Sequence, residues 1–161
     1  MTTRRNKGID YQALAEFRYE IRRFQILSEQ AARNAGIEPQ QYQAILAIKG
    51  LPSADGATVG MLAERLQIQH HSAVELVDRL EKHGLLKRVR SQADRRQVIL
   101  RLTDHGEDTL EQVALPHRSD LRAAGRAMLG ALAEVMDGER RNAKSRSGYS
   151  RRKPMRSARS G

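Results

Sequence analysis

The chain has 161 residues, no cysteine and a formal net charge of +10, and this composition excludes several classes of protein. Its length suits one domain with a real core, while the lack of cysteine excludes disulfides, zinc fingers and thiol redox chemistry. No apolar run approaches a membrane span, and the basic start leads into an amphipathic helix instead of an apolar signal core. We therefore expect a cytoplasmic protein with no membrane contact.

Most of the positive charge lies at the two ends of the chain. Residues 139–161 hold nine Lys and Arg against one acid, a balance of +8, and residues 1–8 add +3. Formal counting leaves about −1 (10 − 8 − 3) for residues 9–138. We predict a flexible basic head over 1–8 and a disordered basic tail over 139–161, which lacks the apolar periodicity needed to offset its ordering entropy.

Two helices are expected before the centre of the chain. The first covers 9–35 and ends at Gly36, because apolar residues recur there three and four positions apart, at Leu14, Phe17, Ile21 and Phe24. Pro39 suits the first turn of a second helix, which runs to Gly50. Residues 51–57 are predicted to form a loop.

The centre of the chain predicts two short helices joined by a turn. Thr58 is a plausible N-cap for the first of them, whose inward residues would be Val59, Leu62, Ala63 and Leu66. The next helix covers about 69–83, with an inward face of Ala73, Leu76, Val77 and Leu80. An alternative start exists, since S-A-V-E from Ser72 to Glu75 is a capping box that would begin this helix at Ser72.

The apolar pattern then changes to that of a strand pair, over 86–90 and 98–102, which predicts a β-hairpin. Between Lys82 and Arg101 the chain carries seven basic residues and one acid, a local charge of +6. Such a concentration suits phosphate, although a solvated charged face is the alternative. After the hairpin, Thr103 can cap a long helix over 104–137, which Pro116 should kink.

A helix-turn-helix followed by a hairpin is typical of a winged module that reads double-stranded DNA. The N-terminal end of the second helix meets base edges in such modules, so Glu75 can accept from cytosine N4 and Val74 can touch a thymine methyl. The candidate contacts on this helix are Gln69, His70, His71, Ser72, Val74, Glu75 and Arg79. On the hairpin, the basic cluster adds Arg88 and Arg90 as candidates.

Several motifs resemble the MarR family of bacterial winged helix-turn-helix regulators over about 39–106. They are LAERLQI and LVDRLEKHGLL in the central helices, ADRR at the hairpin tip and L-x-L-T-x-x-G at its exit. The resemblance implies a mainly α fold in which N- and C-terminal helices dimerise and two reading heads bind a palindromic site. It also implies that Arg96 probes the minor groove, that Asp94 orients it, and that Arg95 contacts a phosphate or the groove.

The resemblance organises the chain into one domain, 9–138, with a reading module over 39–103 and dimerisation helices over 9–35 and 104–137. The apolar stripes of the outer helices support a homodimer independently, because they lie outside the module and need a partner surface. The alternative is a monomer that folds these helices onto its own module.

The family further suggests release by a small aromatic or anionic effector. A cleft near four aromatic residues would admit it, although such side chains more often belong to the core: Phe17, Tyr19, Phe24 and Tyr42.

No catalytic motif appears, and we expect neither an enzyme, a cofactor nor a metal site. The adjacent His70 and His71 diverge by about 100° on a helix and cannot easily share one ion. The sequence thus predicts a nucleoid-associated, sequence-specific repressor that acts as a homodimer on a palindromic operator. The alternatives are an architectural or non-specific DNA-coating protein that uses the basic tail, and a partner-binding adaptor with a decayed DNA head.

Overall fold

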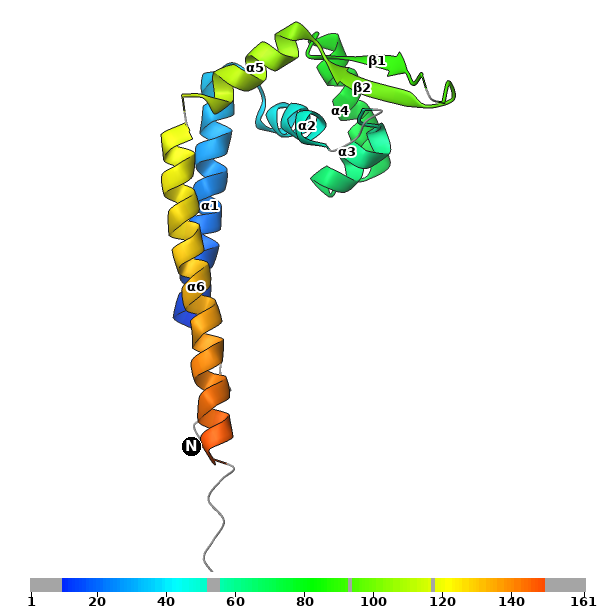
Figure 1. Ribbon diagram of the computed structural model, residues 1–161. Helices are drawn as coiled ribbons and strands as arrows, with labels where there is room; N and C mark the ends of the chain where they lie inside the picture. Colours follow the sequence, from blue (N-terminus) through cyan, green and yellow to red (C-terminus); the bar gives the residue numbers. More distant parts are fainter. Residues whose placement is uncertain (1–9, 52–55, 93, 117, 150–161) are drawn as a thin grey trace, which may run out of the picture. The chain divides into compact units, whose positions relative to one another are not determined.

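The computed structural model describes residues 10–51, 56–92, 94–116 and 118–149 (Figure 1). Their elements are α1 (Tyr11–Asn34), α2 (Pro39–Gly50), α3 (Val59–Leu66), α4 (His70–Lys82), β1 (Leu86–Arg90), β2 (Val98–Leu102), α5 (Asp104–Ala114) and α6 (Arg118–Tyr149). The predicted mainly α fold with a two-stranded hairpin is confirmed. No helix in these described ranges is long and apolar enough to cross a membrane.

The chain divides into two compact units, Gln25–Leu121 and the described parts of Met1–Phe24 with Arg122–Gly161. The first unit contains the helix-turn-helix, the hairpin and α5. The second consists of the start of α1 and most of α6, which run in opposite directions (Figure 1).

The core of Gln25–Leu121 forms where α2, α3, α4 and the hairpin meet. Leu76 and Leu80 of α4 pack with Ile45 of α2 and Leu62 of α3, and all four side chains have no exposed surface. Complete burial of each such side chain stabilises the fold by about 1.5–3 kcal/mol. The predicted inward face of α4 is confirmed, because Ala73 and Val77 are buried as well.

Side-chain caps define where two of these helices begin. The Thr58 hydroxyl accepts a hydrogen bond from the Met61 amide at 3.2 Å, and the Thr103 hydroxyl accepts one from the Gly106 amide at 3.1 Å. Both satisfy amides that have no partner within the helix, so both predicted N-caps are confirmed. The capping box at Ser72 is not used, since α4 begins at His70 with Gln69 as its N-cap.

The hairpin is antiparallel, with Leu86 opposite Leu102 and Arg90 opposite Val98. A short bridge widens it, because Ala57 pairs with Leu100, whose amide donates to the Ala57 carbonyl at 2.7 Å. This bridge joins the start of α3 to β2 and thereby ties the hairpin to the helix-turn-helix.

The C-terminal part of the chain differs from the sequence prediction in two respects. Pro116 does not kink one long helix: α5 ends at Ala114 and α6 begins at Arg118. Proline has no amide hydrogen and its ring clashes with the carbonyl four residues earlier, which is sufficient to end a helix. The tail was expected to be disordered from residue 139, but α6 continues to Tyr149, in a segment rich in good helix formers such as Arg, Lys and Ala. Residues 150–161 and the basic head 1–8 lie outside the described residues.

Candidate nucleic-acid interface

One side of α4 is turned away from the core and carries the predicted reading residues. Because Ala73, Leu76, Val77 and Leu80 bury the opposite side, helical geometry places the remaining side chains outward. The exposed ones are Gln69, His70, His71, Glu75 and Arg79, whereas Ser72 and Val74 are half-buried. The structure therefore collects all seven predicted residues on the accessible side of one helix or at its N-cap.

Arg79 has a partner within the protein as well as solvent exposure. Its Nη2 donates to Gln40 Oε1 on α2 at 3.3 Å. A long bond to a neutral amide at an exposed site is weak. It leaves most of the donors of the guanidinium available to DNA.

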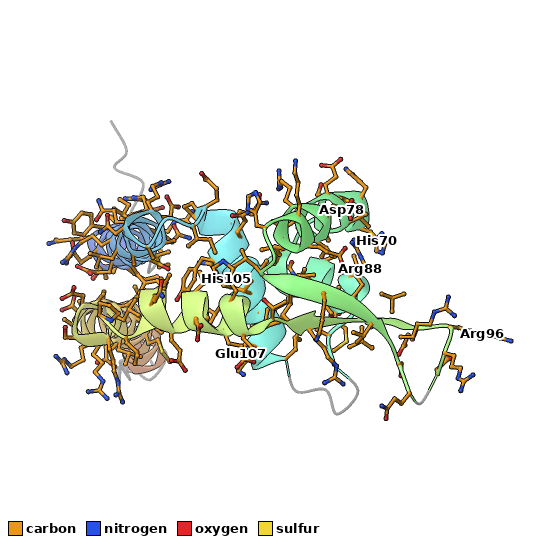
Figure 2. The ribbon with its side chains drawn as sticks, turned by 90° about the horizontal axis from the view of Figure 1, so that it is seen from above. His70, Asp78, Arg88, Arg96, His105 and Glu107 are labelled. Atoms are coloured by element: carbon orange, nitrogen blue, oxygen red, sulfur yellow. The ribbon has the colours of Figure 1, made fainter. Side chains whose placement is uncertain are left out.

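The hairpin tip presents two arginines on a turn that the backbone holds tightly. The Ser91 amide donates to the Gln97 carbonyl at 3.0 Å, and the Gln97 amide donates to the Asp94 carbonyl at 2.9 Å. Arg95 and Arg96 between these bonds are exposed, and Arg96 points away from the helices (Figure 2). The tip is thus a hydrogen-bonded turn with two exposed cationic side chains.

Asp94 acts on Arg96 through the main chain. Asp94 Oδ1 accepts from the backbone amide of Arg96 at 3.0 Å, and the Asp94 amide donates to Ser91 Oγ at 3.2 Å. The resemblance implied that this acid orients the arginine, and the bond it makes shapes the turn from which the side chain extends.

Arg88 is the predicted DNA contact with the most partners inside the protein. Its Nη2 lies 2.6 Å from Asp78 Oδ1 and its Nη1 lies 2.5 Å from Glu81 Oε2, both on α4 (Figure 2). Burial alone would lower the pKa of the guanidinium, but hydrogen bonds and attraction from these two acids raise it above its usual value. Arg90, two residues further along β1, is exposed.

The strand register reveals a basic pair that sequence reasoning did not include among the contacts. Lys87 lies directly opposite Arg101 across the hairpin, and both side chains are exposed. Like charges opposite each other destabilise a strand pair. Both residues had been counted in the basic cluster, but their pairing follows only from the register of the hairpin.

The T-x-x-G motif, Thr103 to Gly106, fixes the end of the hairpin to the end of α4. Thr103 Oγ1 donates to the Gly84 carbonyl at 2.5 Å, and the Thr103 amide donates to the Leu85 carbonyl at 3.2 Å. Gly106 passes so close to Leu85 that a Cβ placed on it would lie 2.0 Å from the Leu85 carbonyl oxygen. Glycine is required here for a close approach of two backbone segments.

The four aromatic residues of the predicted effector cleft belong to different units. Phe17, Tyr19 and Phe24 lie in Met1–Phe24, whereas Tyr42 lies in Gln25–Leu121, where it is a core residue whose pKa is raised by burial. A surface hollow of about 310 Å³ is lined instead by Asp108, Glu111, Gln112, Leu115 and Pro116. None of the four aromatic side chains lines this hollow.

Among the residues with described positions, no group of three His, Asp or Glu side chains could hold a metal ion. His70 and His71 are both exposed at the start of α4.

A buried helix face, an outward helix at the end of a helix-turn-helix and a basic hairpin beside it define a winged helix-turn-helix protein. Residues 35–97 match the model of the MarR family. This part of the chain, which includes α2, α3, α4 and β1, is similar to the MarR family.

Relatives and solved structures show similarity of the same kind. Two proteins of Bacillus subtilis (strain 168) match in sequence: the uncharacterised HTH-type transcriptional regulator YsmB is 29% identical over 86 residues, which is 53% of this chain and 57% of YsmB. The HTH-type transcriptional repressor MdtR is 31% identical over 78 residues, 48% of each chain. The chain thus spans about half the length of these curated relatives.

A mutant MarR from E. coli complexed with operator DNA has the same fold, with a TM-score of 0.60 and 19% identity over 74% of this chain and 87% of that one.

Proposed function

We propose that this protein is a sequence-specific regulator of transcription that binds double-stranded DNA. The observation that carries the proposal is the pairing of an outward reading helix with a basic wing in one unit. α4 buries four residues and exposes its N-terminal turn, while the wing tip exposes Arg95 and Arg96. Elements of this kind fit a major groove and the adjoining backbone.

The two elements would divide the work of recognition. His70, His71 and Glu75 would meet base edges, with Ser72, Val74, Gln69 and Arg79 beside them, because they surround the N-terminal end of α4. Arg96 would enter a minor groove, where cations are attracted by the narrow, negative surface of A·T-rich DNA. Arg90 and Arg95 would contact phosphates, which set affinity and register without reading sequence.

Two copies of the chain would bind one palindromic operator. The unit formed by α1 and α6 leaves large apolar side chains open to solvent, with exposed fractions of 57% at Tyr11, 67% at Leu129 and 51% at Met136. Apolar surface of this kind is buried in symmetric homodimers. A dimer would then place two reading heads on one duplex and raise its affinity by avidity.

The regulator would act in the cytoplasm as a repressor that a small molecule releases. The relative MdtR is named a repressor, which supports this sign of regulation. Release requires an effector that binds the DNA-free conformation better than the DNA-bound one. The hollow along α5 supports such a site in Gln25–Leu121, since apolar and polar side chains line it together, Leu115 and Pro116 with Asp108, Glu111 and Gln112.

A selection experiment tests this function. The full-length protein would be used to enrich duplexes from a random library, and its affinity for the enriched duplex would be compared with that for a scrambled duplex at one salt concentration. A specific regulator prefers the enriched duplex by about 10³-fold or more. Equal affinity for both would indicate the DNA-coating alternative, and no binding to either would indicate the adaptor.

A matched pair of variants tests whether the wing contributes to the preference for the enriched duplex. Arg96→Ala should reduce the preference for the enriched duplex. Arg33→Ala should leave it unchanged, because Arg33 lies on α1 and is paired with Glu29 at 3.1 Å.

A further inference from the structure

The exposed side of α4 carries three acids one turn apart, Glu75, Asp78 and Glu81. Residues three apart lie on the same side of a helix, so these acids form an acidic stripe along the element that faces DNA. Each of them would repel a nearby phosphate. The negative charge of the stripe would therefore weaken the binding of any duplex that α4 approaches.

One arginine of the wing engages two of these acids. Arg88 places Nη2 on Asp78 and Nη1 on Glu81, at 2.6 and 2.5 Å, and the backbone amide of Arg88 donates to Glu81 Oε1 at 3.1 Å. The side chain of Arg88 is 28% exposed, which is less than the 59% of Asp78 and the 41% of Glu81. Two charge-assisted hydrogen bonds and one bond from the Arg88 backbone amide therefore join β1 to α4.

The neighbours of Arg88 show that this engagement is specific to one position. Lys87 and Arg90 on the same strand are exposed and take part in no ion pair among the described residues. Arg88 lies opposite Leu100, and its side chain reaches Asp78 and Glu81 of α4. The one positive charge of Arg88 faces two negative charges, so little of it remains to attract a phosphate.

We propose that Arg88 is a positioning residue for DNA reading and not itself a DNA contact. It holds the wing at a fixed angle to α4 and cancels part of the acidic stripe beside the duplex. The inference rests on the proposed function and replaces the phosphate role that the basic cluster suggested for this residue. If it is correct, the effect of Arg88 on binding depends on the presence of Asp78 and Glu81.

A double-mutant cycle tests this dependence with the full-length protein and its enriched duplex. Arg88→Ala should lower affinity about tenfold in the native background, a change equivalent to about 1.4 kcal/mol. The same substitution in an Asp78→Asn, Glu81→Gln background should change affinity by less than about twofold, because Arg88 then has no acid to cancel. Glu81→Gln keeps an acceptor for the Arg88 amide and so isolates the charge. An equal loss in both backgrounds would overturn the proposal, because a direct phosphate contact does not need the acids.

Arg90→Ala provides the matched control on the same strand. It should lower affinity equally in both backgrounds and reduce the slope of log affinity against log salt by about one, as the loss of one phosphate contact does. Arg88→Ala in the Asp78→Asn, Glu81→Gln background should leave that slope unchanged. A slope that falls by one for Arg88→Ala in this background would also contradict the proposal.

The positioning role has a readout that does not require DNA. Hydrogen exchange at the hairpin amides, measured by mass spectrometry on the free protein, should accelerate in Arg88→Ala and in Asp78→Asn, Glu81→Gln, and should remain at the native rate in Arg90→Ala. Unchanged exchange in the first two variants would refute the tie between wing and helix. Absence of DNA binding by the native protein would refute the proposed function instead, so the two failures are distinguishable.

Discussion

The carboxylate of Asp94 is bonded to the backbone amide of Arg96, at 3.0 Å, within the four-residue turn of the wing tip. An acid beside an exposed arginine would ordinarily be interpreted as its ion-pair partner. Here the acid instead fixes the main chain of the turn, and the guanidinium of Arg96 extends outward. The position of the side chain that would probe DNA is therefore set by a bond that does not consume its charge.

This relationship predicts different results for two substitutions of Asp94. Asp94→Asn keeps an oxygen that accepts from the Arg96 amide, so affinity for the enriched duplex should remain within about twofold of native. Asp94→Ala removes the acceptor and should lower affinity about tenfold while leaving global stability within about 1 kcal/mol, because the tip is exposed. Titration of labelled duplex and denaturant unfolding measure the two quantities. Equal affinities of Asn and Ala variants would show that the bond is not required.

Gly106 gives the sharpest prediction for stability. Gly106→Ala places a methyl group 2.0 Å from the Leu85 carbonyl oxygen, and the two backbones must separate. Overpacking of this kind costs about 1–3 kcal/mol. Gly130→Ala is the matched control, because a Cβ there meets nothing within 4 Å, and it should raise the free energy of unfolding by up to about 1 kcal/mol through helix propensity. Unfolding in urea at a fixed protein concentration compares the variants.

Lys87 and Arg101 should show opposite signs in stability and binding. Lys87→Thr removes one of two like charges that face each other across the hairpin, so the free energy of unfolding should rise by a few tenths of a kcal/mol. The same change should weaken DNA binding and reduce the salt slope by about one. A fall in stability together with unchanged binding would mean that the pair serves the fold. Urea unfolding and binding titrations at several salt concentrations decide whether the pair serves DNA binding or the fold.

Glu75 should determine base preference. It is exposed on the first two turns of α4 and has no ion-pair partner among the described residues. A carboxylate accepts from cytosine N4, whereas glutamine bonds adenine in two places. Glu75→Gln should therefore change the preferred base pair at one position of each half-site by about 1–3 kcal/mol. Repeating the selection with the variant measures this change, and an identical consensus would exclude Glu75 from base contact.

The exposed apolar side chains of the α1 and α6 unit should hold two chains together. Leu129→Glu introduces a charge where a partner surface is expected, and it should shift the protein toward monomer in sedimentation experiments. Glu134→Gln on the exposed surface of the same helix should leave the assembly unchanged. A protein that is monomeric at all concentrations before substitution would rule out the homodimer.

The fold of the reading module could be predicted because its signals are local. The inward face of α4 follows from residues three and four apart, the hairpin from alternation, and the caps at Thr58 and Thr103 from single side chains. The partners of Arg88 could not be predicted in this way. They are seven and ten residues away in sequence, and they meet Arg88 only because the chain reverses after α4.

The other differences from the sequence prediction have separate causes. The sequence showed that Pro116 perturbs a helix. Whether the helix bends or ends there depends on how the segments on each side pack, and the sequence does not show this packing. The helix through residues 139–149 was missed because the prediction weighed apolar periodicity, whereas long charged side chains have good intrinsic helix propensity. The effector cleft near four aromatic residues stays a prediction, because three of them lie in one compact unit and Tyr42 lies in the other.

Thr103 connects the end of α4 to the start of α5 through hydrogen bonds. One threonine bonds the carbonyls of Gly84 and Leu85, just beyond α4, and also caps α5 through Gly106. Because one residue makes all of these bonds, a movement of α5 would act directly on the residues that follow α4. A molecule that bound along α5 would therefore act on the reading helix without approaching the DNA surface.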